Sequence, residues 1–109
     1  MIKKTDQKIE NAIRIALTDV CNIALDEVPG FKWITHFVDY NAFPSSLIIV
    51  CVFGTKQELT AALSDRFDDV LRRLIVSKLG AANIQCKNSQ QFVRFDSEET
   101  WEVQKYRLH

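Results

Sequence analysis

The sequence predicts an α+β protein, a two-layer sandwich in which long helices pack on one face of an antiparallel sheet. Three observations predict it. A helix-period apolar pattern covers residues 5–27, an apolar run at residues 47–53 has the pattern of a buried strand, and a second long helical pattern covers residues 55–79. The expected order of elements is α-β-β-α-β-β-(α), and residues 1–109 have the length of a single domain.

The first predicted helix begins near Thr5, with Thr5 or Asp6 as its cap, and ends before the Pro-Gly pair at residues 29–30. Two further isoleucines, Ile15 and Ile23, lie outside the main apolar stripe, so this helix is expected to bury more than one side. The stripe itself follows steps of three and four residues, the spacing of an amphipathic helix: Ile9, Ala12, Ile13, Ala16, Leu17, Val20, Ala24 and Leu25.

Two strands are predicted next, over Phe31–Asp39 and Leu47–Phe53. In the first strand, strict alternation predicts one face made of Phe31, Trp33, Thr35 and Phe37, and an opposite face made of Lys32, Ile34, His36 and Val38. The second strand, LIIVCVF, is apolar on both faces, as expected for a strand covered on both sides. Because the two strands are close in the sequence, an antiparallel hairpin with a long loop is the simplest pairing.

The loop DYNAFPSS and the histidine before it form the best surface candidate for binding. His36 and Asp39 lie three residues apart, so on a strand they point to opposite faces and form no catalytic pair. We expect a half-buried His36 with hydrogen-bonded ring nitrogens. The predicted interaction surface consists of His36, Tyr40, Phe43 and Pro44. Phe43 either anchors the loop on the core or contacts a partner.

A capping box at Thr55–Glu58 predicts the start of the second long helix. The helix is expected to run without an internal turn to Leu79, with Gly80 as its left-handed C-terminal residue. Two short strands are predicted at Ile84–Cys86 and Gln91–Phe95. The segment from residue 96 to residue 109 begins with a helix-start signature, because acidic residues precede basic ones.

The sequence predicts no catalytic residue, metal ligand or cofactor site. Three cysteines without a C-x-x-C pair favour reduced thiols packed in a reducing compartment, with a metal site or a nucleophile as the alternative. A nucleophile would need Cys51 beside His36, and Cys51 lies in the most apolar run. Three glycines are too few for a Walker loop or a dinucleotide fingerprint, and none forms the loop of a KH domain. Three aspartates and three arginines within residues 65–73 are expected to pair on a solvated helix face.

The charge pattern disfavours a nucleic-acid partner. Fourteen basic and fourteen acidic residues give a formal net charge of zero, and no segment is strongly basic. A modest basic patch of Arg72, Arg73, Lys78 and Lys87 is the only candidate surface for phosphates. No signal peptide and no membrane-spanning run is predicted, so we expect a cytoplasmic protein without a membrane partner.

Two segments, Lys4–His36 and Phe43–Phe53, resemble a family of short bacterial proteins labelled Fis-type transcriptional regulators. The resemblance implies DNA binding and transcriptional control. A Fis-type protein ends in a basic helix-turn-helix, whereas residues 96–109 hold four acidic residues, two basic residues and one histidine. The resemblance therefore assigns no DNA-contacting residue in this sequence.

The sequence as a whole favours a non-enzymatic interaction or regulatory module that acts as a homodimer. The run at residues 47–53 is apolar on both faces, and few helices are available to cover two sides of the sheet. A second copy or a protein partner is expected to cover the second face. A nucleic-acid-associated transcriptional regulator is the alternative, and an enzyme is the hypothesis with the least support.

Overall fold

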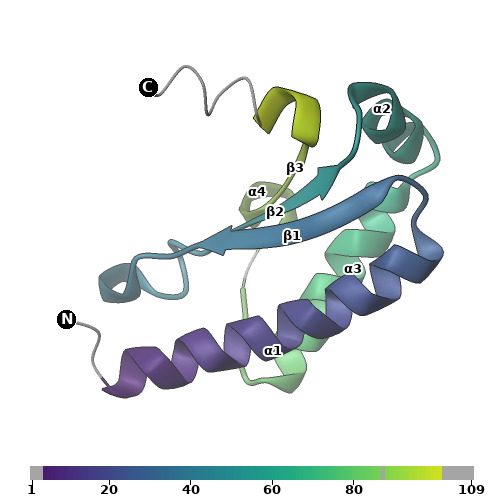
Figure 1. The fold of residues 1–109 in the computed structure, drawn as a ribbon. Helices are drawn as coiled ribbons and strands as arrows, with labels where there is room; N and C mark the ends of the chain where they lie inside the picture. Colours follow the sequence, from purple (N-terminus) through teal and green to yellow (C-terminus); the bar gives the residue numbers. More distant parts are fainter. Residues whose placement is uncertain (1–3, 87, 102–109) are drawn as a thin grey trace.

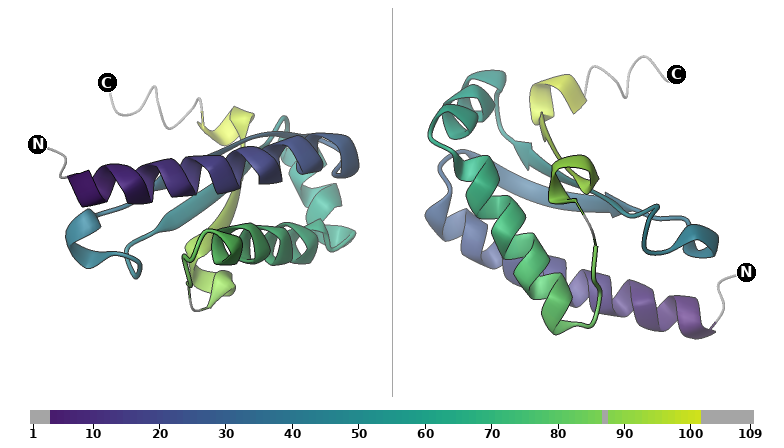
Figure 2. Two further views of the ribbon diagram at one scale, coloured as in Figure 1. Left: turned by 90° about the horizontal axis from the view of Figure 1, so that it is seen from below. Right: turned by 180° about the vertical axis from the view of Figure 1, so that it is seen from behind.

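The computed structural model describes residues 4–86 and 88–101 (Figure 1). The α+β class is confirmed, and helices α1 and α3 lie beneath one face of the sheet (Figure 2). Residues 98–101 form a helical turn on the other side of the sheet. The elements in chain order are α1 (Lys4–Glu27), β1 (Phe31–Phe37), the 3-10 turn η1 (Tyr40–Ala42), β2 (Ile48–Phe53), α2 (Lys56–Ser64), α3 (Phe67–Ala81), α4 (Ser89–Phe92) and β3 (Val93–Ser97).

The sheet has three strands in the order β1-β2-β3, and it is mixed rather than antiparallel. Strands β1 and β2 pair antiparallel, as predicted, whereas β2 and β3 pair parallel. The parallel pairing arises because α2 and α3 form a crossover that returns the chain to the starting end of β2. Of the two predicted C-terminal strands only the second forms, shifted to Val93–Ser97, and residues 84–86 form no strand.

Strand β2 is the centre of the fold and is buried on both faces, as the sequence predicts. Ile49, Cys51 and Phe53 point into the layer between the sheet and the two long helices. That core also contains residues from α1 and α3: Ile13, Ala16, Leu17, Val20, Ala24, Leu71, Ile75 and Leu79. Val50 and Val52, which alternate with the first set, lie on the opposite, outer face and are buried there.

A β-bulge in β1 changes which of its residues face the core. The register shifts between Phe31 and Trp33. The predicted face of Trp33, Thr35 and Phe37 therefore does not include Phe31, which was wrongly placed on it. Phe31 is buried in the core and packs edge-to-face on Phe53, with ring centroids 6.1 Å apart. The extra residue reverses the alternation, so that Trp33 and Phe37 lie on the outer face.

The predicted long helix of residues 55–79 is two helices, because the chain turns at Asp65 and Arg66. The predicted cap is confirmed at its start, where the Glu58 backbone N–H donates to Thr55 Oγ1 at 3.0 Å. Arg66 has a left-handed backbone with φ of 63°, a conformation that is strained for a residue with a Cβ atom. The break leaves α2 at the end of the sheet and lets α3 pass beneath it (Figure 1).

Gly80 does not end the second long helix as predicted. It lies inside α3, which runs to Ala81, and the left-handed residue after the helix is Asn83, with φ of 63°. Asparagine is one of the few side chains that accept this conformation readily. In the described part of the chain, no helix has the length and hydropathy needed to span a membrane.

The left-handed conformation of Arg66 generates a stability prediction. Arg66→Val should lower the free energy of unfolding by about 1–2 kcal/mol, because a β-branched residue fits this region worst. Arg66→Gly should be neutral or stabilising, since glycine adopts positive φ freely. Urea unfolding followed by circular dichroism measures both.

Arg73→Gly is the matched control for the same change inside α3. It should cost about 1 kcal/mol, the usual penalty for glycine in a helix interior. If Arg66→Gly is as destabilising as Arg73→Gly, the helix break does not depend on the left-handed residue.

Candidate functional site

The carboxylate of Glu10 contacts two side chains from other elements, so that three separate elements meet at this point. Glu10 comes from α1, His36 from β1 and Tyr40 from η1. His36 Nε2 lies 2.9 Å from Glu10 Oε1 and 3.2 Å from Oε2, and the Tyr40 hydroxyl donates to Oε2. The structure thus brings together two of the four predicted surface residues and adds Glu10, which the sequence did not indicate. His36 is partly buried, as predicted, and one of its two ring nitrogens, Nε2, has a hydrogen-bond partner.

The cluster perturbs the acidity of two of its members in opposite directions. Burial acts to raise the pKa of Glu10, but hydrogen bonds from Tyr40 and His36 and the charges of His36 and Arg14 outweigh it. The pKa of Glu10 therefore lies below its ordinary value of 4.5. Burial and the neighbouring Glu10 carboxylate raise the pKa of Tyr40 to about 12. Both pKa shifts favour the same state, in which an ionised Glu10 carboxylate accepts a hydrogen bond from a neutral Tyr40 phenol.

The rest of the loop is closed by local hydrogen bonds. Asp39 accepts from the Asn41 backbone N–H at 3.0 Å, which is the turn role predicted for it. Ser46 Oγ donates to the Asp39 carbonyl at 2.7 Å and accepts from the Asp39 N–H at 2.9 Å. Phe43 is half-buried and packs against the core, whereas Pro44, which follows a cis peptide bond, is exposed. The loop is therefore anchored by Phe43 and by the Glu10 cluster.

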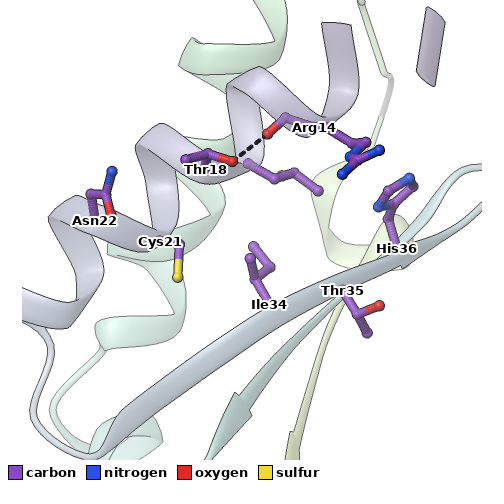
Figure 3. A pocket seen from close by; sticks show the side chains of 8 residues that line it. Arg14, Thr18, Cys21, Asn22, Ile34, Thr35 and His36 are labelled. Carbon is purple, nitrogen blue, oxygen red and sulfur yellow. Dashed lines mark hydrogen bonds between the residues drawn. The ribbon is translucent and has the colours of Figure 1, made fainter. Parts of the chain in front are cut away.

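A groove of about 370 Å³ continues from His36 along the side of α1. Its walls come from α1 and from the outer edge of β1: Arg14, Leu17, Thr18, Cys21, Asn22, Ile34, Thr35 and His36. Figure 3 shows that Ile34 and His36 point toward α1 and that Thr35 points away from it. Burial raises the pKa of the Cys21 thiol in this wall. The groove is an open channel between a helix and a sheet edge.

The outer face of the sheet carries an aromatic cluster of Trp33, Phe37 and Trp101. The Trp33 and Trp101 rings meet edge-to-face with centroids 5.2 Å apart, and Phe37 stacks on Trp101 at 6.5 Å. Trp33 Nε1 also donates to Glu98 Oε1 at 3.0 Å. Phe37 remains 52% exposed. The sequence placed Trp33 and Phe37 on one face, but no local pattern connected them to Trp101.

The cysteine–histidine pair considered as a nucleophile does not form. In the strand register Cys51 lies opposite Ile34, whereas His36 lies opposite Ile49. Burial raises the pKa of Cys51 to about 12, so its thiol is not activated. All three cysteines are free. Within residues 4–86 and 88–101, no group of three or more His, Cys, Asp or Glu side chains could hold a metal ion.

Arg72, the first residue of the predicted basic patch, is engaged inside the fold. Its Nη1 donates to Asp68 Oδ2 at 3.0 Å, as predicted for an ion pair on this helix, and its Nε donates to the Ser89 carbonyl at 3.2 Å. The guanidinium carbon lies 4.9 Å from the centroid of Phe95. Arg72 joins α3 to α4 and β3 and is not free to bind phosphate. Lys87 lies outside the described residues.

Comparison with protein-family models, curated proteins and solved structures finds no match to this chain. The site must therefore be interpreted from its own geometry.

The Glu10 cluster generates a pH-dependent stability prediction. Tyr40→Phe should lower the free energy of unfolding by about 1 kcal/mol at neutral pH, because it removes a partly exposed hydrogen bond to a carboxylate. The pKa of Tyr40 is raised, so this contribution is present below its ordinary pKa of 10.0 and is lost as the pH rises toward 12. Urea unfolding at a series of pH values measures the difference.

Glu10→Gln should show the opposite pH dependence. The pKa of Glu10 is lowered, so the carboxylate stabilises the fold above its ordinary pKa of 4.5, and this contribution disappears as the pH falls through the lower folded value. Asp19→Asn, at an exposed position of α1, is the matched control and should have little effect. A Glu10→Gln difference that does not shrink in acid would contradict the assigned interaction.

Proposed function

We propose that the chain is a non-enzymatic interaction module that acts as a homodimer and uses the outer face of its sheet as a contact surface. The observation that supports it is the aromatic cluster of Trp33, Phe37 and Trp101. Tryptophan, tyrosine and phenylalanine are enriched in protein interfaces, where they bury a large area at a small cost in conformational entropy. Phe37 is a large aromatic residue that is 52% exposed and stacks on Trp101, which in turn contacts Trp33.

The polar side chains support a binding role more than catalysis. His36 is held by Glu10, and Tyr40 is held by the same carboxylate. Cys51 is buried with a raised pKa. A catalytic site needs a nucleophile or base that can reach a substrate, and these groups are instead bonded to one another or enclosed.

A nucleic-acid-binding regulator is the alternative implied by the resemblance to Fis-type proteins. Aromatic side chains on a sheet can also stack on the bases of a single strand, which is the feature in its favour. The engagement of Arg72 and the zero net charge count against it. Salt-sensitive binding of single-stranded or duplex DNA at low ionic strength, lost in Phe37→Ser, would favour this alternative.

The proposed function predicts a dimer that depends on Phe37. Light scattering after size-exclusion chromatography should give twice the chain mass at tens of micromolar protein. Phe37→Ser should weaken association by about 2 kcal/mol, more than tenfold, because a truncated aromatic anchor is a typical interface hot spot. Its melting temperature should change little, since Phe37 is half exposed.

Leu63→Ser is the control for removing an exposed apolar side chain elsewhere. Leu63 is 44% exposed on α2 and is not part of the aromatic cluster. This variant should keep the association constant of the unmodified chain. A strictly monomeric unmodified chain at these concentrations would overturn the homodimer.

A further inference from the structure

The outer edge of β1 is one of the two edges of the sheet and has fewer permanent charges than β3, which carries Arg94 and Asp96. Strand β1 is the first in the order β1-β2-β3, and no described segment pairs with its other side. An open edge presents unpaired N–H and C=O groups that can bind another strand. Natural edge strands usually carry proline, several charges or a cover, but β1, with the sequence FKWITHF, has seven residues, no proline and only Lys32 as a permanent charge. Its bulge lies at the Phe31 end and leaves residues 33–37 regular.

We propose that two copies of the chain pair their β1 strands antiparallel about a twofold axis at Thr35, which joins the two three-stranded sheets into one. This inference rests on the proposed homodimer and specifies its geometry. A closed twofold dimer requires a surface that is complementary to itself. The residues of β1 meet that requirement in one register.

Pairing about Thr35 places favourable side-chain pairs on both faces of the sheet. On the outer face, Trp33 lies opposite Phe37 of the partner subunit, and Thr35 lies opposite Thr35 of the partner subunit. Aromatic pairs and threonine pairs are among the stabilising cross-strand neighbours. On the inner face, Ile34 lies opposite His36 of the partner subunit. No like charges face each other, because Lys32 lies opposite Val38 of the partner subunit.

A shift of the axis by one residue loses these pairs. With the axis at Ile34, Trp33 would face Thr35 of the partner subunit and Lys32 would face His36 of the partner subunit. With the axis at His36, Trp33 would face Asp39 of the partner subunit. Only the axis at Thr35 unites the two aromatic clusters into one continuous surface on the outer face.

Helix α1 supplies a second surface on the same side of the molecule. It flanks the edge of β1 across the groove in Figure 3. Leu25 is 52% exposed and follows Arg14, Thr18 and Cys21 at steps of four, three and four, so it extends the helix stripe that lines the groove. Joining the sheets brings the two α1 helices toward each other and would cover this stripe, which a single copy leaves in water.

The test places charge on the axis. Thr35→Glu and Thr35→Lys each put two like charges directly opposite each other, so each variant should dimerise about tenfold or more weakly than the unmodified chain. An equimolar mixture of the two variants should form a heterodimer, detected by native mass spectrometry, with association restored toward the unmodified value. Thr60→Glu and Thr60→Lys, at an exposed threonine of α2, are the matched controls and should leave the dimer unchanged.

The outcomes separate this inference from the proposed function. A monomeric unmodified chain overturns both. A dimer that is lost in Phe37→Ser but unaffected by either Thr35 variant supports the proposed function with a face-to-face geometry and overturns the edge pairing. Weakened single variants with a restored mixture support the edge pairing, and weakened variants without restoration overturn it.

A covalent test covers the case in which a charge at residue 35 unfolds the chain. In a background carrying Cys21→Ser and Cys86→Ser, Thr35→Cys places two thiols opposite each other on the axis. Mild oxidation should convert most of the protein to a disulfide-linked dimer, whereas Thr60→Cys in the same background should not. Equal cross-linking of the two variants would overturn the edge pairing.

Discussion

The burial of β2 on both faces is the constraint on which the rest of the structure depends. A strand with apolar side chains in both directions needs a packed layer above and below it. The long helices α1 and α3 provide the inner layer over Ile49, Cys51 and Phe53. Among residues 4–86 and 88–101 no further helix of comparable length is left for the outer layer, so Val50 and Val52 are buried there by other means. The aromatic side chains of Trp33, Phe37 and Trp101 lie on that face.

The bulge in β1 makes that outer layer available. Without the extra residue between Phe31 and Trp33, the two would share a face, and either the core or the outer layer would lose an aromatic ring. Trp33 then holds the C-terminal helical turn through Glu98 and Trp101. In the same turn Glu99 accepts from the Lys56 backbone N–H at 2.7 Å, at the first residue of α2. The outer layer and the start of α2 are thus fixed by one short segment.

The sequence predicted the features that depend on local periodicity and on capping. The end of α1 at Glu27, the two-sided burial of β2 and the cap at Thr55 all have local signals, and the structure confirms them. The predicted cap at the start of α1 is wrong, because Thr5 lies inside the helix. The break at Arg66 has no local signal, because an arginine gives no indication of a left-handed backbone. The parallel pairing of β3 also has no local signal, because it depends on the whole helical crossover between β2 and β3, which returns the chain to the starting end of β2.

The candidate site was predictable only in part for a related reason. His36 and Tyr40 stand out because they are close together in the sequence, but Glu10 is one of several acidic residues on α1. Glu10 becomes the partner of His36 and Tyr40 because β1 runs back along α1. This arrangement brings into contact residues that are separated by 26 and 30 positions in the sequence. The contacts of Trp101 could not be predicted for the same reason, because Trp33 and Phe37 are far from it in the sequence.

These contacts constrain β1 unequally on its different sides. On the inner side Glu10 holds His36 and the following turn, and on the outer side Trp101 and Glu98 hold Trp33. The lateral edge has no strand partner among the described residues. A strand fixed on two sides and open on the third loses little conformational freedom when another strand binds it, so most of the ordering cost of association is already met in the folded monomer. In the proposed dimer, the role of the polar cluster at Glu10 is to hold the edge of β1 in place.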